Sequence, residues 1–196
     1  MKKFYLLLLL ISFIIFIAGY ASATQVSQKE TTSGVVEVTT PEGKAQVINV
    51  TKLGVFTENL MFSAPSNWYI VIQGTAEVEE YGAKNGAFYV KIKNPGDAFW
   101  HIQFGTHVPI PAGKKYKITF EAKADAARDL QVRVIQDQTW EIVESKVFDL
   151  TTEMQKFEWE FTPKKDGHIV VFDMGKVSEK SIATTIYLAN VELVEE

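Results

Sequence analysis

The sequence predicts an all-β protein, a two-sheet antiparallel β-sandwich of the jelly-roll type. Nearly every segment after residue 45 alternates apolar and polar residues with the two-residue period of half-buried strands. Gly, Pro and Asn residues separate these segments, and no stretch longer than a turn or two has a helical period. Short strands without intervening helices are typical of a sandwich or barrel, and roughly 150 residues suffice for one domain with a single core.

Each predicted strand has one apolar row that we expect to face the core. In chain order the strands are GAFYVKIKN (86–94), FWHIQFG (99–105), PAGKKYKITFEAKAD (111–125), DLQVRVIQDQ (129–138), QKFEWEFTP (155–163), HIVVFDMG (168–175) and TTIYLANVELVE (184–195). The clearest core rows are Tyr116, Ile118, Phe120 and Ala122, then Leu130, Val132 and Val134, and then Phe157, Trp159 and Phe161. The dipeptide Asn85-Gly86 predicts a tight hairpin turn, and NPGD (94–97) predicts a second turn.

The stretch DAFWHIQFG (97–105) has an unusual second face. As one strand, it would place Ala98, Trp100, Ile102 and Phe104 toward the core. Phe99, His101 and Gln103 would then form the opposite face, which combines an aromatic ring, an imidazole and an amide. The first row is an ordinary core face, and the second is not.

The chain begins MKKFYLLLLLISFIIFIAGYASATQ, in which two lysines precede an apolar run and Ala21-Ser22-Ala23 provides a small-x-small cleavage pattern. We predict a signal peptide over residues 1–23, a polar Thr- and Ser-rich tether over 24–45 and a domain over 46–196. A retained membrane anchor is the alternative for the first segment, and an edge strand is the alternative for GVVEVTT within the second. The expected location is secreted, periplasmic or cell-surface.

Composition excludes several classes of function. Removal of residues 1–23 lowers the basic residues from 20 to 18 against 24 acidic residues, a net charge of −6 with His neutral. A mildly acidic domain without a basic cluster is a poor partner for nucleic acid or, after signal cleavage, for an anionic membrane. The absence of Cys excludes disulfides, a lipid-anchored N-terminal Cys and a Cys nucleophile.

Catalytic interpretations have little support. The histidines at 101, 107 and 168 lack the close spacing of metal ligands, and no Gly-x-Ser-x-Gly motif is present. A glycosidase needs two carboxylates about 5–9.5 Å apart across a cleft. Glu158 and Glu160 instead alternate with core aromatics on a face that we expect to be solvated. We therefore predict no catalytic residue and no cofactor for chemistry.

The order of the segments from Asn59 to Leu193 resembles that of the carbohydrate-binding modules of families 4 and 9. The matching elements are Trp68, GAFYVKI, WHIQF, IPAGKKYKITFEAKA, QVRVIQDQTW, FDLTTEMQKFEWEFT, VVFDMG and IYLANVEL. The resemblance implies a jelly roll whose concave sheet holds a β-linked polysaccharide or oligosaccharide, such as a β-glucan or xylan chain. Because such modules are commonly attached to glycoside hydrolases, a separately encoded glycoside hydrolase is an expected partner.

The resemblance also implies particular site residues. By position it implies ligand-binding roles for Gln103, Arg133, Gln138, Trp140 and Asp173, with His101 and Trp68 as further candidates. It implies a structural calcium ion as well, with Asn59 and Asn190 as candidate oxygen ligands. Asn190 stands where the family usually has an Asp-Asp pair before the final Val.

The residue types suit a sugar, because aromatic rings match the C–H faces of a pyranose and planar amide or guanidinium groups bridge neighbouring hydroxyls. Each also has a structural interpretation. Trp100 and Trp159 are expected in the core, Trp68 lines the cleft or closes the end of the sandwich, and Trp140 is the best candidate for an exposed stacking ring. Arg133 could instead pair with Asp173 or Glu121. The alternative functions are a structural or adhesive envelope protein and, third, a small glycoside hydrolase.

Overall fold

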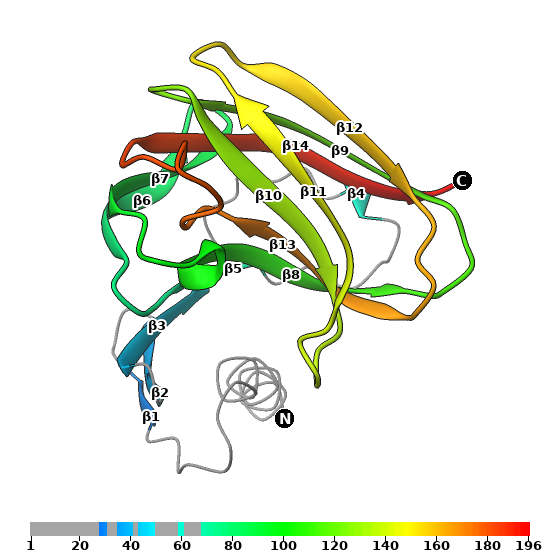
Figure 1. Cartoon of the computed structure of the whole chain (residues 1–196), viewed down its shortest axis with the longest axis horizontal. Helices are drawn as coiled ribbons and strands as arrows, with labels where there is room; N and C mark the ends of the chain where they lie inside the picture. Colours follow the sequence, from blue (N-terminus) through cyan, green and yellow to red (C-terminus); the bar gives the residue numbers. More distant parts are fainter. Residues whose placement is uncertain (1–27, 31–34, 41–42, 50–58, 61–67) are drawn as a thin grey trace.

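The computed structural model confirms the predicted all-β sandwich of two mainly antiparallel sheets (Figure 1). It describes residues 28–30, 35–40, 43–49, 59–60 and 68–196. The larger sheet has the strand order β1-β2-β3-β5-β8-β13-β10-β11, and the smaller sheet has the order β12-β9-β14-β7-β6, with β4 parallel to β14. No helix in these ranges is long and apolar enough to cross a membrane.

The strands and the one short helix of these ranges follow in chain order. They are β1 (Gln28–Glu30), β2 (Val35–Thr40), β3 (Gly43–Asn49), β4 (Asn59–Leu60), β5 (Trp68–Ile72), β6 (Glu77–Lys84), β7 (Ala87–Asn94), the 3-10 helix η2 (Phe99–His101), β8 (Ile102–Ile110), β9 (Tyr116–Ala124), β10 (Arg128–Ile135), β11 (Ile142–Leu150), β12 (Gln155–Phe161), β13 (Gly167–Asp173) and β14 (Thr185–Glu195).

The segment predicted as a tether contains strands. GVVEVTT includes β2, which joins the larger sheet between β1 and β3. The structure therefore agrees with the alternative interpretation, in which this segment adds a strand. Strand β3 crosses the predicted boundary at residue 46 and pairs with β5. The expected signal peptide lies outside the described residues, and the boundary at residue 46 stays a prediction.

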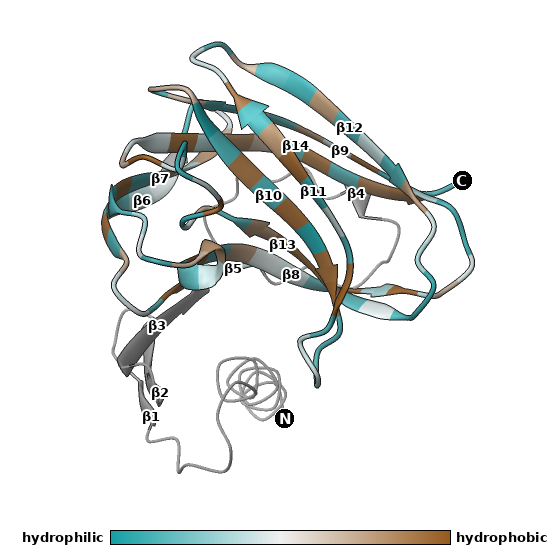
Figure 2. Cartoon of the chain, in the orientation of Figure 1, coloured by the Kyte–Doolittle hydropathy of each residue, from teal (hydrophilic) through white to brown (hydrophobic). Residues whose placement is uncertain are grey.

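The core lies between the two sheets and consists of the apolar rows expected from the alternation. Along β10 and β12 the hydropathy changes from residue to residue, as Figure 2 shows. Phe120 is fully buried and contacts the rings of Phe148, Phe157 and Phe172 from three other strands. Trp159 is also buried, as predicted. Burial of these rings from both sheets is the main force that holds the sandwich together.

The turn at Asn85-Gly86 joins β6 to β7 as predicted. Both residues have positive φ angles, 53° and 79°, which is the backbone of a tight hairpin turn that Asn-Gly favours. The two strands then pair in register from Lys84 opposite Ala87.

The stretch 97–105 does not form one strand, and this expectation was wrong in its first half. Phe99–His101 form η2, and β8 begins only at Ile102. The alternation therefore holds for Ile102, Gln103 and Phe104 but not before them. Trp100 is half-buried and lies outside the core cluster, contrary to its expected place in the core.

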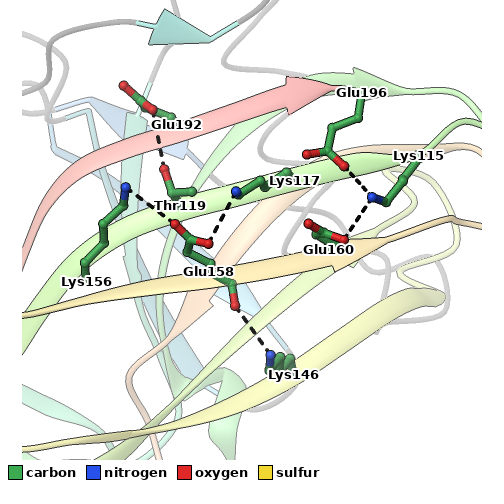
Figure 3. Close-up of polar contacts among 9 residues, drawn as sticks. All are labelled: Lys115, Lys117, Thr119, Lys146, Lys156, Glu158, Glu160, Glu192 and Glu196. Atoms are coloured by element: carbon green, nitrogen blue, oxygen red, sulfur yellow. Dashed lines mark hydrogen bonds and ion pairs between the residues drawn. The ribbon is translucent and has the colours of Figure 1, made fainter.

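The outer face of the smaller sheet carries paired Lys and Glu side chains (Figure 3). Lys117 contacts Glu158 at 3.3 Å, and Lys115 contacts Glu160 at 2.9 Å and Glu196 at 2.6 Å. These lysines lower the pKa values of Glu158 and Glu160. A general acid of a glycosidase needs a raised pKa, so this pair of carboxylates has the wrong electrostatics for that role.

Candidate functional site

The register of four neighbouring strands defines a polar row outside the core. Gln131 of β10 lies opposite Asp173 of β13, Asp173 lies opposite Gln103 of β8, and Gln103 lies opposite Val71 of β5. Residues that are paired across strands share one face of a sheet. The core rows of these strands face inward, so this row lies on the outer face of the larger sheet.

The next row on this face is formed by Arg133, Val171, Gly105 and Tyr69. It therefore places a guanidinium and a phenol ring beside the amide and carboxylate of the first row. Val171 and Tyr69 are buried but do not belong to the core cluster.

Gln103, Arg133 and Asp173, which we call the Arg133 cluster, are brought together as the sequence predicts. Arg133 donates from Nε to Asp173 Oδ2 at 2.5 Å and from its second terminal nitrogen to Oδ1 at 2.7 Å. Gln103 donates to the same Oδ1 at 3.3 Å. The bidentate geometry fixes the plane of the guanidinium, which is the strongest arrangement of an Arg–carboxylate pair.

The cluster is buried, with relative exposures of 5% for Gln103, 3% for Arg133 and 0% for Asp173. Burial raises the pKa of Asp173, while Arg133 and then the Gln103 hydrogen bond act in the opposite direction. Of the structural alternatives for Arg133, pairing with Asp173 is the one that the structure has. Its partner was named from the sequence, but the burial of the pair was not expected.

Phe99 adds an aromatic ring to the cluster. The Arg133 guanidinium carbon lies 4.8 Å from the centre of the Phe99 ring, within the range of a cation–π contact. The ring reaches this position from η2, whose backbone is tied to the segment after β13 by the bond from the Gly175 amide to the Phe99 carbonyl oxygen. The sequence placed Phe99 on the non-core face, although for a different local structure.

His101 has a structural position outside the cluster. Its Nδ1 accepts a hydrogen bond of 3.1 Å from the Asp97 amide. A Cβ added at Gly74 or Gly96 would lie 2.4 Å from its ring. The buried imidazole therefore packs between two glycine backbones, which explains why NPGD precedes it. The structure does not bring it to the Arg133 cluster.

Trp68 belongs to the core, which decides between the two interpretations of this residue. It is 2% exposed, and its ring stacks on Phe104 at 4.6 Å between centroids. It therefore does not line the outer face. Tyr69, the next residue, points to that face instead, and the period of two in WYIVI is the signal that could have identified it.

Gln138 and Trp140 lie in the loop that joins β10 to β11. Gln138 is exposed, whereas Trp140 is buried with 7% exposure, so the expectation of an exposed stacking ring was wrong. Trp140 lies outside the core cluster and has a φ of 59°, an angle that disfavours residues with a Cβ. The loop follows Ile135, which shares the outer face with Arg133, so Trp140 lies past the end of β10 that is nearer to Arg133.

Arg128 is a buried residue that sequence reasoning missed. It is 1% exposed and donates to the backbone carbonyl oxygens of Met174, Gly175 and Ile182 at 2.8, 3.0 and 2.8 Å, and to that of Asp129 at 3.1 Å. It therefore ties both ends of the 174–182 segment to β10. An Arg at the start of a strand gives no sequence signal for this role.

The predicted calcium ligands lie beside β14. Asn190, at a bulge of β14, donates to Glu121 Oε2 at 2.9 Å, and the side chain of Asn59 is outside the described residues. Asn190 and Glu121 line a surface depression together with Glu192 and Lys156. Among the residues described, no group of three or more acidic, His or Cys side chains is arranged to hold a metal ion. Calcium remains a prediction.

The fold has two packed β-sheets, and an amide, a guanidinium, a carboxylate and aromatic rings are grouped outside its core. This combination is typical of β-sandwich binding modules. The comparisons with known proteins identify the family within that class. The chain belongs to the carbohydrate-binding domain family of the 4/9 type, whose sequence model matches residues 55–176. The family and its neighbours in structure are non-catalytic binding domains, and its members bind polysaccharides.

Solved structures share this fold, and the first of them also supports the family assignment. A family 4 carbohydrate-binding module is 32% identical, with a TM-score of 0.61 over 73% of this chain and 97% of its own. The N-terminal cellulose-binding domain of Cellulomonas fimi β-1,4-glucanase C is 18% identical, with a TM-score of 0.50 over 66% and 88%. The second such domain of that enzyme is 20% identical, with a TM-score of 0.50 over 63% and 86%. Comparison with curated proteins found no significant match.

Proposed function

We propose that this protein binds a β-linked polysaccharide or its oligosaccharides, such as a β-glucan or a xylan, without cleaving it. The proposed site is the outer face of the larger sheet across β5, β8, β13 and β10. The observation that carries the proposal is the grouping of the Arg133 cluster with the ring of Phe99 outside the core. Family membership supports the same ligand class.

The chemistry of these groups fits a sugar chain. Phe99, which is half-buried, offers a ring to the C–H face of a pyranose, while Gln103 and Arg133 offer planar donors to its hydroxyls. Sugar hydroxyls exchange water for protein partners with little net gain, so we expect a modest dissociation constant of about 10⁻³–10⁻⁶ M. Gln138 and Trp140 in the adjacent loop are proposed to extend the site along the sugar chain.

The setting of this activity is also part of the proposal. A signal peptide over residues 1–23 would place the protein outside the cytoplasm, as a secreted, periplasmic or surface protein. There it would retain soluble glycan or present it to a separately encoded glycoside hydrolase. A calcium ion near Asn190 would have a structural role only.

One observation favours the second candidate, a structural or adhesive envelope protein. Arg133 and Asp173 pair with each other and are buried, so losing either partner would leave an uncompensated buried charge, and the pair has a structural role even without a sugar. Binding through this face requires that a glycan reach Gln103 and Arg133. The test must therefore measure binding and the accessibility of this face together.

The deciding experiment uses the secreted chain that begins at Thr24. Affinity electrophoresis against a panel of soluble β-glucans, xylans and α-glucans should retard the protein in specific β-linked polysaccharides. Isothermal titration with the best oligosaccharide should then be compared between the parent and Gln103→Ala, and hydrogen exchange of β8 and β13 should slow when the sugar is added.

The outcomes separate the three candidate functions. Binding that is lost in Gln103→Ala, with no reducing ends released from the polysaccharide, supports the proposal. No retardation by any glycan would favour the envelope protein. Release of reducing ends that depends on a single acidic residue would favour the glycoside hydrolase.

A further inference from the structure

The Arg133 cluster contains a charge pair that is complete before any ligand binds. Two nitrogens of the Arg133 guanidinium donate hydrogen bonds to the two carboxylate oxygens of Asp173, at 2.5 and 2.7 Å. Gln103 adds a third donor to that carboxylate at 3.3 Å. The charge of the guanidinium is therefore neutralised inside the protein, and the direction of its plane is fixed.

The outward-facing rows of the described strands β5, β8, β13 and β10 offer no second cation to an anionic ligand. Within the described strands β5, β8, β13 and β10, Arg133 is the only Lys or Arg in the outward-facing rows. Arg128 belongs to the opposite row and donates to backbone carbonyl oxygens. The outward row of β10 also contains Asp129, which accepts a hydrogen bond from the Ser181 hydroxyl. The charged side chains of these four outward rows are thus Arg133, Asp173 and Asp129, which sum to a net negative charge, while Lys180 near Asp129 is paired with Asp149.

We propose that Asp173 is a specificity-determining residue, which makes the site select neutral glycans over glycans that carry carboxylates. This inference rests on the proposed function and specifies its ligand class. A uronic acid group would approach Arg133 against the charge of Asp173, and its own carboxylate would lose water without gaining a free cation. An amide at position 173 would keep hydrogen-bonding groups there but would leave the charge of Arg133 uncompensated.

The test compares two matched pairs of ligands by isothermal titration at low salt. One pair is a neutral xylo-oligosaccharide and the same oligosaccharide with a glucuronic acid branch. The other pair is a cello-oligosaccharide and its carboxymethylated form. The proteins are the parent from Thr24, Asp173→Asn, and Glu160→Gln as a control. Glu160 lies on β12 of the smaller sheet, is exposed and pairs with Lys115, so its substitution removes the same charge away from the cluster and its sheet.

The parent should bind the neutral member of each pair about tenfold or more tightly than the charged member. This factor corresponds to roughly one charge-assisted hydrogen bond that the charged glycan cannot make. Asp173→Asn should reduce this preference by about tenfold or reverse it, and its binding of the charged member should weaken with salt. Glu160→Gln should keep the preference of the parent. The double variant Arg133→Gln/Asp173→Asn should lose the affinity for the charged glycan that Asp173→Asn gained.

The outcomes distinguish this inference from the proposed function. A parent that binds none of the glycans contradicts the proposed function and, with it, the inference. A parent that binds, while Asp173→Asn keeps the same preference, contradicts the inference alone. If Asp173→Asn does not fold, the parent decides, because equal affinity for the neutral and the charged member of a pair would overturn the role of Asp173.

Discussion

The backbone of Gly175 lies directly against the backbone of Phe99, and its amide donates a hydrogen bond of 3.2 Å to the Phe99 carbonyl oxygen. A Cβ added at Gly175 would lie 2.4 Å from the carbonyl oxygen of Ala98 and 2.7 Å from that of Phe99. Both contacts are with backbone, so they cannot be relieved by moving a side chain. The position of η2, and with it the ring over Arg133, depends on a glycine at 175.

We therefore predict that Gly175→Ala destabilises the fold by about 1–3 kcal/mol, the usual cost of overpacking a tight contact. Glycan binding should weaken as well, because η2 must move. Urea unfolding and isothermal titration measure the two effects. Gly82→Ala is the matched control, since its Cβ would meet only the far end of the Tyr89 side chain, at 3.2 Å. Equal stability of the two variants would contradict the prediction.

Arg128 gives a second prediction, for the segment that follows Asp173. Burial lowers the pKa of Arg128 to about 10, so the guanidinium stays charged at neutral pH and keeps all its donors. Arg128→Met should cost about 3–5 kcal/mol, because it leaves several buried carbonyl oxygens without a donor. Chemical denaturation checks this value, with Lys123→Met on the outer face of the smaller sheet as the control.

Arg128→Lys separates charge from geometry at the same site. A lysine keeps the positive charge, but its single nitrogen cannot reach four carbonyl oxygens in the fork geometry of a guanidinium. It should therefore recover less than half of the stability lost in Arg128→Met. Full recovery would show that charge alone holds the 174–182 segment.

Much of the fold was predictable from the sequence because its strands alternate in a way that only one register satisfies. Phe120, Val132 and Trp159 are buried as expected, since a slip of one residue would turn each whole row outward. The predicted strand was wrong where a local side-chain contact, and not the alternation of apolar and polar residues, determines the backbone. At Phe99–His101 the imidazole packs against two glycines, and the chain forms a 3-10 turn instead of a strand.

The candidate site was predictable in part. Gln103, Arg133 and Asp173 meet because each lies on the non-core face of a strand, and the strand order brings them together. Their burial was not predictable, since exposure depends on everything that packs against a face and not on the period of one strand. The same reason explains Trp140, whose polar neighbours in sequence suggested an exposed ring.

The pairing of Arg133 changes what truncation should do. Its place on a non-core face alone would make Arg133→Ala nearly neutral for stability. In the structure, the substitution leaves a buried carboxylate at Asp173 with Gln103 as its remaining side-chain donor among the described residues, so we expect a loss of about 3–5 kcal/mol. The double variant Arg133→Ala/Asp173→Ala should lose less than Arg133→Ala alone. Urea unfolding of the three proteins tests this, and a more stable single variant would contradict the buried pair.

His107 predicts a dependence of stability on pH. Burial lowers the pKa of His107 below its ordinary value of 6.5, with Asp137 raising it and His168 lowering it further. The unfolded chain therefore takes up this proton near pH 6.5, while the folded protein takes it up only at lower pH. Unfolding binds a proton in that interval, so stability falls as pH decreases from 6.5 toward the folded pKa. Between about pH 7 and pH 5, the urea midpoint of His107→Gln should fall less than that of the parent protein. If the midpoints of the two proteins fall equally with pH, the prediction is wrong.

The last prediction concerns Trp140, where side chain and backbone can be tested separately. The ring is buried, so Trp140→Ala should lower stability as well as any glycan affinity to which the ring contributes. A residue with a Cβ is strained at a φ of 59°, whereas glycine is not. Trp140→Gly therefore removes the same ring as Trp140→Ala and also removes the backbone strain. Trp140→Gly should therefore be about 1 kcal/mol more stable than Trp140→Ala, while both bind glycan equally weakly. Urea unfolding gives the first comparison and isothermal titration the second. Parental glycan binding in both variants would remove Trp140 from the proposed site, and a less stable glycine variant would show that the loop does not need its left-handed residue.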